Sequence, residues 1–360
     1  MKVPLAVIWA AIGVDGFLLI SFTTLVVASR ALRLKRERTA ARRLAPLRPL
    51  LLEVASEDDP QAGSLRRLQS LGPDDWEALV PAAAGLLGKL RGSSKQQIAS
   101  LLDAHGSTAR AYGDLFARRA TRRARAAEMI GSLGHEELAP RLLRLLEDKR
   151  HDVRLVAARA LGQLRSADAS AGLIAAAGER SPIPRGVLGH ALLRIGHRAV
   201  PELTRALSSP DWRRRSLAAD LLGRLGALSA AEQLAGLASD DPALSVRVGA
   251  VEALGRFGLP EWLGPLAGAA GRKNPSRLRE AAVEALSGVA TPEAVSVLGS
   301  LTGDGDIRVG AKAAVSLASL GPLGRAALER VLSADLDDEE KARAAAQASG
   351  ALALVAAGGR

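Results

Sequence analysis

An arginine recurs along this chain at a nearly constant interval of about thirty residues. The successive gaps are 31, 31, 30, 32, 32 and 29 residues. A period of this length is typical of stacked repeats, in which each unit is too small to bury its apolar face without its neighbours. The repeat therefore constrains the fold more than any other feature. The seven positions are Arg123, Arg154, Arg185, Arg215, Arg247, Arg279 and Arg308.

The residues after each arginine follow helical spacing. Apolar side chains three, four, six and seven positions further on form one face of an amphipathic helix. Small residues at three and eight positions further on, in most repeats, favour close helix packing, and prolines such as Pro292 mark the starts of intervening helices. Each unit is thus predicted to be an antiparallel helix pair. The aliphatic residue seven positions on is Ile130, Leu161, Leu192, Leu222, Leu254, Leu286 or Val315.

Acidic side chains near the arginines suggest how these helices begin. Asp152 and Asp306 each stand two residues before an arginine, and Ser245 and Thr121 hold the same position in two other repeats. Short polar side chains of this kind accept hydrogen bonds from the first free backbone N–H groups of a helix. We therefore predict that they cap the arginine-bearing helices.

The segment from Asp152 to Leu164 carries a family resemblance. It reads DVRLVAARALGQL, which fits the pattern D-x-R-x-x-A-A-x-A-L-G-x-L of the short HEAT-like repeats of the phycobilisome-lyase class. The resemblance covers residues 107–321 and implies an all-α fold, a right-handed superhelix whose second helices line the concave side. It also implies that the recurrent arginines form a ladder of contacts between adjacent units, with recurrent aspartates as their counterparts. Binding residues are then expected elsewhere on these helices.

The chain divides into five predicted segments, with divergent helical repeats capping the array at both ends. They are a transmembrane anchor at 1–29, a basic juxtamembrane segment at 30–48, N-terminal capping repeats at 49–106, HEAT-like repeats at 107–321, and a C-terminal capping repeat at 322–360.

The N-terminal segment has the composition of a membrane span. Between Val3 and Ala28 the one charged residue is Asp15, and 26 residues at about 1.5 Å each exceed a hydrocarbon core of about 30 Å. The alternative is a cleaved signal peptide, which an apolar stretch of this length and an arginine-rich flank disfavour. Asp15, beside Gly13 and Gly16, predicts a contact with another membrane helix or self-association; the alternative is one tolerated acid.

The excess positive charge of the chain, +11, is concentrated directly after that segment. Residues 30–48 contain eight basic residues and one acidic residue, a net +7. Under the positive-inside rule this flank places the N-terminus outside and the solenoid in the cytoplasm, as a single-pass cell-membrane protein. Nucleic acid is disfavoured as a partner because the repeats carry little of the charge. The basic residues are Arg30, Arg33, Lys35, Arg36, Arg38, Arg42, Arg43 and Arg48.

A second set of side chains, five and nine positions after each arginine, is expected on the concave surface. Mixed charge there favours a protein partner, since a nucleic-acid backbone requires one sign. The alternative is a solvated face with intrahelical pairs such as Asp220–Arg224 and Glu252–Arg256. The predicted concave ridge consists of Arg159, Gln163, His190, Arg194, Asp220, Arg224, Glu252, Arg256 and Glu284.

The sequence offers little for catalysis. It contains no cysteine, no phosphate-binding glycine loop, and one His-Glu dyad, His135–Glu136. We therefore predict no catalytic residue, metal or cofactor. The predicted function is a membrane-tethered scaffold or adaptor that binds a protein partner, as an assembly factor or regulator of an envelope or transport machine. The alternative is a HEAT-like repeat enzyme of the bilin lyase or metal hydroxylase type.

Overall fold

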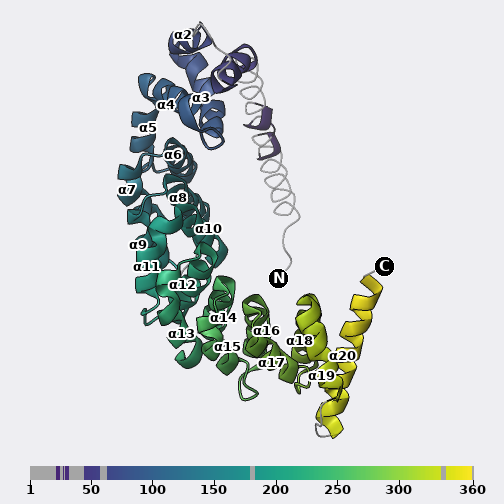
Figure 1. The fold of residues 1–360 in the computed structure, drawn as a ribbon. Helices are drawn as coiled ribbons and strands as arrows, with labels where there is room; N and C mark the ends of the chain where they lie inside the picture. The colour runs from purple at the N-terminus through teal and green to yellow at the C-terminus, as the bar shows by residue number, and fades with distance from the viewer. Residues whose placement is uncertain are drawn as a thin grey trace, which may run out of the picture. The chain divides into compact units, whose positions relative to one another are not determined.

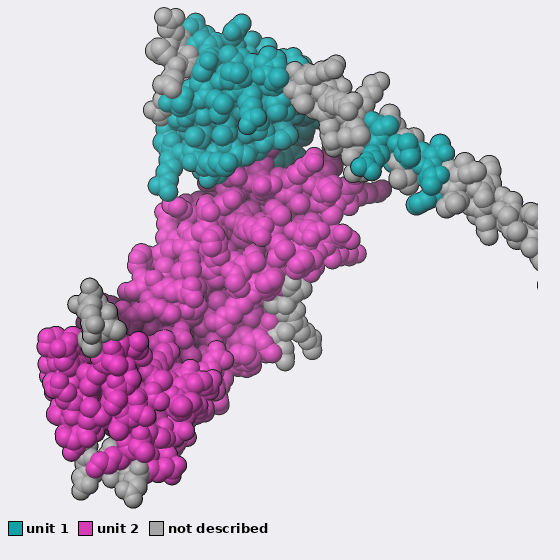
Figure 2. All heavy atoms as spheres, turned by 90° about the vertical axis from the view of Figure 1, so that its right-hand side faces the viewer, with its two compact units in different colours: residues 1–114 teal, residues 115–360 magenta. Residues whose placement is uncertain are grey.

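The chain forms two compact units, residues 1–114 and 115–360, which Figure 2 colours separately. The computed structural model describes residues 22–24, 27, 29–31, 44–56, 63–178, 183–333 and 338–358. Every regular element within these ranges is helical. The prediction of an all-α solenoid is confirmed for the described residues. The handedness of the superhelix and the five segment boundaries stay predictions.

Unit 1 packs its helices around a buried tryptophan. Trp76 is 2% exposed, and its ring stacks on His105 with a centroid distance of 4.0 Å. Its indole N–H donates to Oγ of Ser107 at 2.8 Å, so both the polar and the apolar parts of the side chain are satisfied. Besides the helical residues 44–56, the unit contains α2 (Gly63–Gln69), α3 (Pro73–Leu87), α4 (Gly92–Ala104) and α5 (Ser107–Asp114).

Unit 2 consists of two layers of helices (Figure 1). One layer holds the arginine-bearing second helices: α6 (Ala120–Leu133), α8 (His151–Leu164), α10 (Arg185–Ile195), α12 (Trp212–Leu225), α14 (Leu244–Phe257), α16 (Ser276–Val289) and α18 (Ile307–Ser319). The other holds the first helices: α7 (Ala139–Arg144), α9 (Asp168–Ala175), α11 (Val200–Ala206), α13 (Ala231–Asp240), α15 (Leu263–Ala269), α17 (Pro292–Leu301) and α19 (Gly321–Ser333). A long helix, α20 (Asp338–Gly358), packs on α18 and α19.

Close packing between second helices depends on glycine. The glycine eight positions after an arginine lies against the alanine six positions after the next arginine. A methyl group on that glycine would lie 2.5 to 2.7 Å from the alanine Cα, so the helices approach closely because no side chain separates them. The predicted role of the small residues is confirmed at these joints. The pairs are Gly131–Ala160, Gly162–Ala191, Gly223–Ala253 and Gly255–Ala285.

The aliphatic position seven residues after each arginine is buried, as predicted, in six of the seven repeats. Ile130, Leu161, Leu192, Leu222, Leu254 and Leu286 are all 0% exposed. Val315 is 55% exposed, so the prediction is wrong for the last repeat. In α18 the buried face lies two positions later relative to the arginine than in the other repeats, and two residues rotate a helix face by about 200°. Leu317, at 0% exposure, takes the buried position instead.

The cap predictions are confirmed for one helix and wrong for others. Asp306 precedes α18 and accepts a hydrogen bond from the Arg308 backbone N–H at 3.0 Å. Asp152, Ser245 and Thr121 instead lie one residue inside their helices, because those helices begin three residues before the arginine. A side chain inside the first turn cannot take the N-cap geometry.

The prediction of a single-pass membrane protein is wrong on the evidence of the structure. No helix among the described residues is both long enough and apolar enough to cross a membrane. The prediction was drawn from residues 1–29, and Asp15 and most of that segment lie outside the described residues. So do Arg33, Lys35, Arg36, Arg38, Arg42 and Arg43 of the predicted basic flank, while Arg30 lies within them.

Candidate protein-binding surface

Three of the recurrent arginines bind an aspartate in the following repeat, in the loop between its first and second helices. In the clearest case, Nε and Nη2 of Arg279 donate to the two carboxylate oxygens of Asp304 at 2.8 and 2.7 Å. The side chains are 10% and 1% exposed, so this bidentate pair is buried. Planar two-point contacts of this kind are among the strongest hydrogen bonds in proteins. The other two pairs are Arg123–Asp148 and Arg215–Asp241, with bonds of 2.7 to 2.9 Å.

Each of these aspartates also orders the loop that leads into the next second helix. Oδ1 of Asp148 accepts from the Arg150 backbone N–H at 2.8 Å, directly before α8. The Arg123 guanidinium lowers the pKa of the Asp148 carboxyl below its ordinary value, because it stabilises the charged form. Asp241 in turn raises the pKa of Arg215. The arginine thereby connects two consecutive loops through one buried charge pair.

Two other recurrent arginines reach neutral groups in the next repeat. Arg185 donates from Nη1 to Oγ of Ser216 at 3.0 Å and from Nη2 to its carbonyl at 2.9 Å. Arg247 donates from Nη2 to Oδ1 of Asn274 at 2.5 Å. Both contacts join adjacent repeats, but neither involves a buried carboxylate.

The remaining two arginines, Arg154 and Arg308, form no hydrogen bond or ion pair with the following repeat within the described residues. Nη1 of Arg154 donates to the carbonyl of Asp148 at 2.7 Å, in the loop before its own helix. Arg308 is 71% exposed and lies 3.2 Å from Asp306 and 3.6 Å from Glu280. We propose that the ladder operates through the five arginines that reach the following repeat.

The predicted ridge is internally paired in its second half. Arg224 on α12 donates to Asp220 at 2.8 Å within one helix. Arg256 on α14 lies 3.7 Å from the same Asp220 and 3.4 Å from Glu252. One carboxylate therefore links two arginines from adjacent helices. The next ridge position, Glu284 on α16, pairs with Lys312 on α18 at 2.5 Å.

The first half of the ridge differs. Arg159 on α8 and both His190 and Arg194 on α10 are exposed. Within the described part of the chain, no side-chain hydrogen bond or ion pair is formed by any of these three. Gln163 is half-buried, and its Oε1 is buried without a hydrogen-bond partner there. Arg159 and Arg194 therefore carry uncompensated positive charge at the surface.

The joint between α10 and α12 is packed differently from its neighbours. The position eight residues after Arg185 is Leu193 instead of glycine. One turn earlier, a methyl group on Gly189 would lie 3.6 Å from Leu217 and 3.7 Å from Leu221, which is ordinary van der Waals contact. Larger side chains therefore separate these two helices.

A hollow of about 290 Å³ lies beside the start of α12. Trp212 lines it and is 40% exposed, with the Arg213 guanidinium 4.6 Å from its ring centroid. This geometry is a cation–π contact at the rim of the hollow. Sequence reasoning did not single out this aromatic residue, since no second aromatic lies near it in the sequence.

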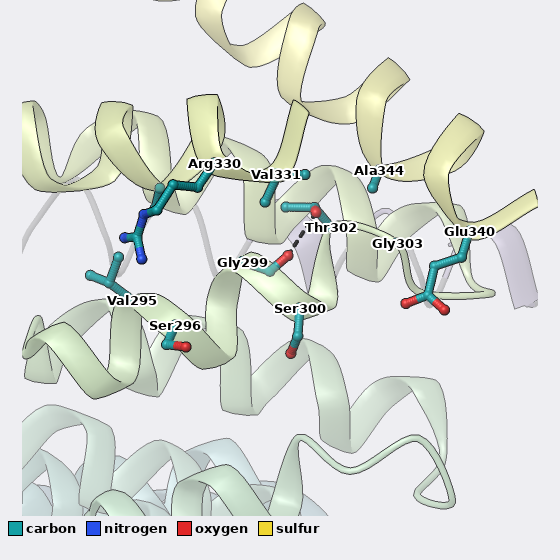
Figure 3. A pocket seen from close by; sticks show the side chains of 11 residues that line it. Val295, Ser296, Gly299, Ser300, Thr302, Gly303, Arg330, Val331, Glu340 and Ala344 are labelled. Atoms are coloured by element: carbon teal, nitrogen blue, oxygen red, sulfur yellow. Dashed lines mark hydrogen bonds between the residues drawn. The ribbon is translucent and has the colours of Figure 1, made fainter. Parts of the chain in front are cut away.

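A second hollow, of about 230 Å³, lies between α17, α19 and α20 (Figure 3). Arg330 and Glu340 stand at opposite ends of it, and Thr302 donates to the Gly299 carbonyl at 2.7 Å in between. Glu340 forms an ion pair with Arg272. The charge that a ligand would meet at that end is therefore already compensated.

The two residues of the histidine dyad contact different partners. Nδ1 of His135 lies 2.9 Å from Glu137, whereas Glu136 accepts from Arg198 at 2.9 Å. Among the described residues, no group of three histidine or acidic side chains is placed to hold a metal ion. Each residue of the dyad thus contacts another side chain at the surface instead of its neighbour.

Known structures share this helical architecture. A mutant of Kap121p superposes with a TM-score of 0.52 at 15% identity, covering 81% of this chain and 38% of that one. The karyopherin Kap121p bound to the SUMO protease Ulp1p gives a TM-score of 0.51 at 15% identity, covering 80% and 37%. Kap121p bound to the extreme C-terminus of the protein phosphatase Cdc14p gives 0.51 at 15%, covering 80% and 38%. The chain thus spans less than two fifths of the length of these relatives, and the likeness concerns the fold.

No curated protein matches the chain. The family of HEAT repeats matches in four overlapping stretches, residues 118–192, 170–254, 200–287 and 238–318. Together these matches extend over residues 118–318, more than half of the chain, and they include all seven recurrent arginines. The chain therefore belongs to the HEAT-repeat family.

Proposed function

We propose that this protein is a scaffold or adaptor whose second helices in unit 2 hold a protein partner along the ridge from Arg159 to Glu284. The family membership supports a repeat stack as the framework. The karyopherin Kap121p, which shares the fold, has been crystallised with a SUMO protease and with the C-terminus of a phosphatase. Binding of a protein by such a surface is therefore physically reasonable for this chain.

The observation that carries the proposal is the register of the ridge. Equivalent side chains from α8, α10, α12, α14 and α16 lie at the same two helical positions, and all are exposed or half-buried. The core is filled by other positions, so these side chains are available for contacts. Their mixed charges suit a folded protein or peptide better than a nucleic-acid backbone.

A role as an assembly factor or regulator forms part of the same proposal. A scaffold acts through the molecule that it holds, and the ridge offers binding groups without an arrangement for bond chemistry. The absence of a cofactor and of catalysis stays a prediction.

Site-specific photo-cross-linking tests the proposal. A benzophenone amino acid is placed at Gln163 or Glu252 on the ridge, and at Glu232 on the first helix α13 as a matched control. We expect protein adducts from the ridge positions and few from Glu232, because the partner covers one layer. Equal adduct formation from both layers, or none from the ridge, contradicts the proposal.

A further inference from the structure

Building on the proposed function, we infer that the partner presents an acidic peptide segment to this protein, and that Arg159 and Arg194 bind it. These two arginines belong to the ridge and are exposed. Within the described residues their side chains have neither an ion pair nor a hydrogen bond. The inference specifies the chemistry of the partner and the part of the ridge that it contacts.

The two arginines are brought together by the closest kind of helix contact in the stack. Gly162 of α8 lies against Ala191 of α10, where a methyl group on the glycine would lie 2.7 Å from the alanine Cα. Helices in contact usually lie about 8 to 10 Å apart, and contact through glycine favours the lower end of that range. Arg159 precedes Gly162 by three residues and Arg194 follows Ala191 by three, so both flank this contact on the ridge side.

The arginines equivalent to Arg194 in the next two helices are already paired. Arg224 and Arg256 share Asp220, and Arg256 also contacts Glu252. A carboxylate from a partner would have to displace these internal contacts. At Arg159 and Arg194 it replaces water alone, and a guanidinium binds a carboxylate through two parallel hydrogen bonds. An acidic segment therefore gains most from α8 and α10.

The neighbouring charges limit the kind of anion that fits. Glu128 on α6 is exposed at the same ridge position as Arg159, and Asp220 on α12 occupies that position beyond His190. Unpaired cations thus extend over two helices, because the arginines that follow on α12 and α14 are paired with Asp220 and Glu252. A nucleic-acid backbone needs a longer run of cations, whereas one or two carboxylates of a short peptide fit this spacing.

Selection of random peptides provides the test. The full chain is immobilised, and displayed 12-residue peptides are selected at 150 mM salt, with a 20-nucleotide single-stranded DNA as a competing probe in a parallel arm. We expect an enriched sequence rich in Asp and Glu that DNA does not displace. The enriched peptide is then titrated against two matched double variants, Arg159→Gln with Arg194→Gln, and Arg224→Gln with Arg256→Gln.

The two variants separate the possible outcomes. We expect the first to weaken binding by about tenfold or more, as loss of charge-assisted bonds implies, and the second by less than about threefold. A basic or uncharged consensus, or a larger loss in the second variant, overturns this inference but leaves ridge binding intact. Peptides that are insensitive to every ridge substitution contradict both proposals. If the DNA displaces the peptide, and this displacement depends on Arg159 and Arg194, then these arginines bind nucleic acid and the inference of an acidic peptide is wrong. All four arginines are exposed, so retained helical circular dichroism is expected for both variants.

Discussion

The joint between α14 and α16 and the joint between α10 and α12 come from the same sequence period but pack differently. At the first, Gly255 lies against Ala285, where a methyl group would be 2.5 Å from Cα. At the second, leucines separate the helices, and Arg185 donates hydrogen bonds to uncharged acceptors on Ser216. The repeat period therefore specifies that helices stack. The side chains at the crossing determine how closely they do so.

The ridge also differs between its two halves. From α12 onwards, carboxylates pair with basic side chains on the same or a neighbouring helix, whereas Arg159 and Arg194 on α8 and α10 are unpaired within the described residues. A stack of similar units thus presents a charge-compensated surface in one half and a cationic surface in the other. In our proposal, the recurrent arginines stabilise the stack and the ridge residues of the same helices bind the partner.

The largest expected effect concerns the buried charge pair. Replacing Arg279 with alanine leaves the carboxylate of Asp304, 1% exposed, without its cation. Loss of one partner of a buried pair costs about 3–5 kcal/mol. Arg185→Ala, at the α10–α12 joint, should cost about 1 kcal/mol, because Arg185 is exposed and its acceptors on Ser216 are neutral. Urea unfolding followed by circular dichroism measures both, and equal losses would show that the α16–α18 and α10–α12 joints depend on arginine alike.

The next effect compares glycines. Gly255→Ala forces the backbones of α14 and α16 apart and should cost about 1–3 kcal/mol, because the obstructing atom is backbone. Gly189→Ala meets leucine methyl groups at van der Waals distance and should be neutral or stabilising by up to about 1 kcal/mol from helix propensity. Gly236 in α13 has no atom within 4 Å of an added methyl and serves as a control for propensity alone. Thermal midpoints that fall equally for Gly255→Ala and Gly189→Ala would remove the distinction between the joints.

Much of the stack follows from periodicity. The spacing of the arginines, the buried aliphatic positions and the glycines at the crossings are all visible in the sequence, because the same local packing recurs every thirty residues. Val315 shows where this reasoning fails. An alignment on Arg308 fixes the register by a single residue, whereas the packing of the whole helix places Leu317 instead of Val315 in the core.

The aspartates that bind the arginines were not predicted individually. The motif draws attention to Asp152, which is 79% exposed, whereas Arg123 binds Asp148, four residues earlier. The pair is 25 residues apart in sequence, and a whole first helix lies between its members. On the ridge, the nine positions followed from helical spacing. Which of them form ion pairs depends on the distances between side chains of adjacent helices, and a single sequence does not specify these distances.

The pH dependence of stability tests the pair at the α6–α8 joint. Arg123 holds the folded-state pKa of Asp148 below the unfolded value, about 3.9. The stability that this carboxylate contributes is therefore complete above that pH and is lost as the pH falls towards the folded pKa. Asp148→Asn should be less stable than the wild type at pH 7, and the difference should shrink between pH 5 and pH 3. Unfolding at several pH values measures it, and a pH-independent difference would assign the effect to packing instead of charge.

The smallest effect concerns the ridge pairs themselves. Asp220, Arg224 and Arg256 form a network in which both arginine side chains are well exposed, at 52% and 38%. Exposed pairs contribute about 0.2–1 kcal/mol, since water screens the attraction and long side chains lose freedom. A double-mutant cycle between Asp220→Asn and Arg256→Gln should therefore give a coupling of about 0.5 kcal/mol, reduced at 1 M salt. A coupling above about 2 kcal/mol would mean that the paired half of the ridge stabilises the stack as the buried arginines do. The contrast between a stabilising ladder and a binding ridge would then hold for α8 and α10 alone.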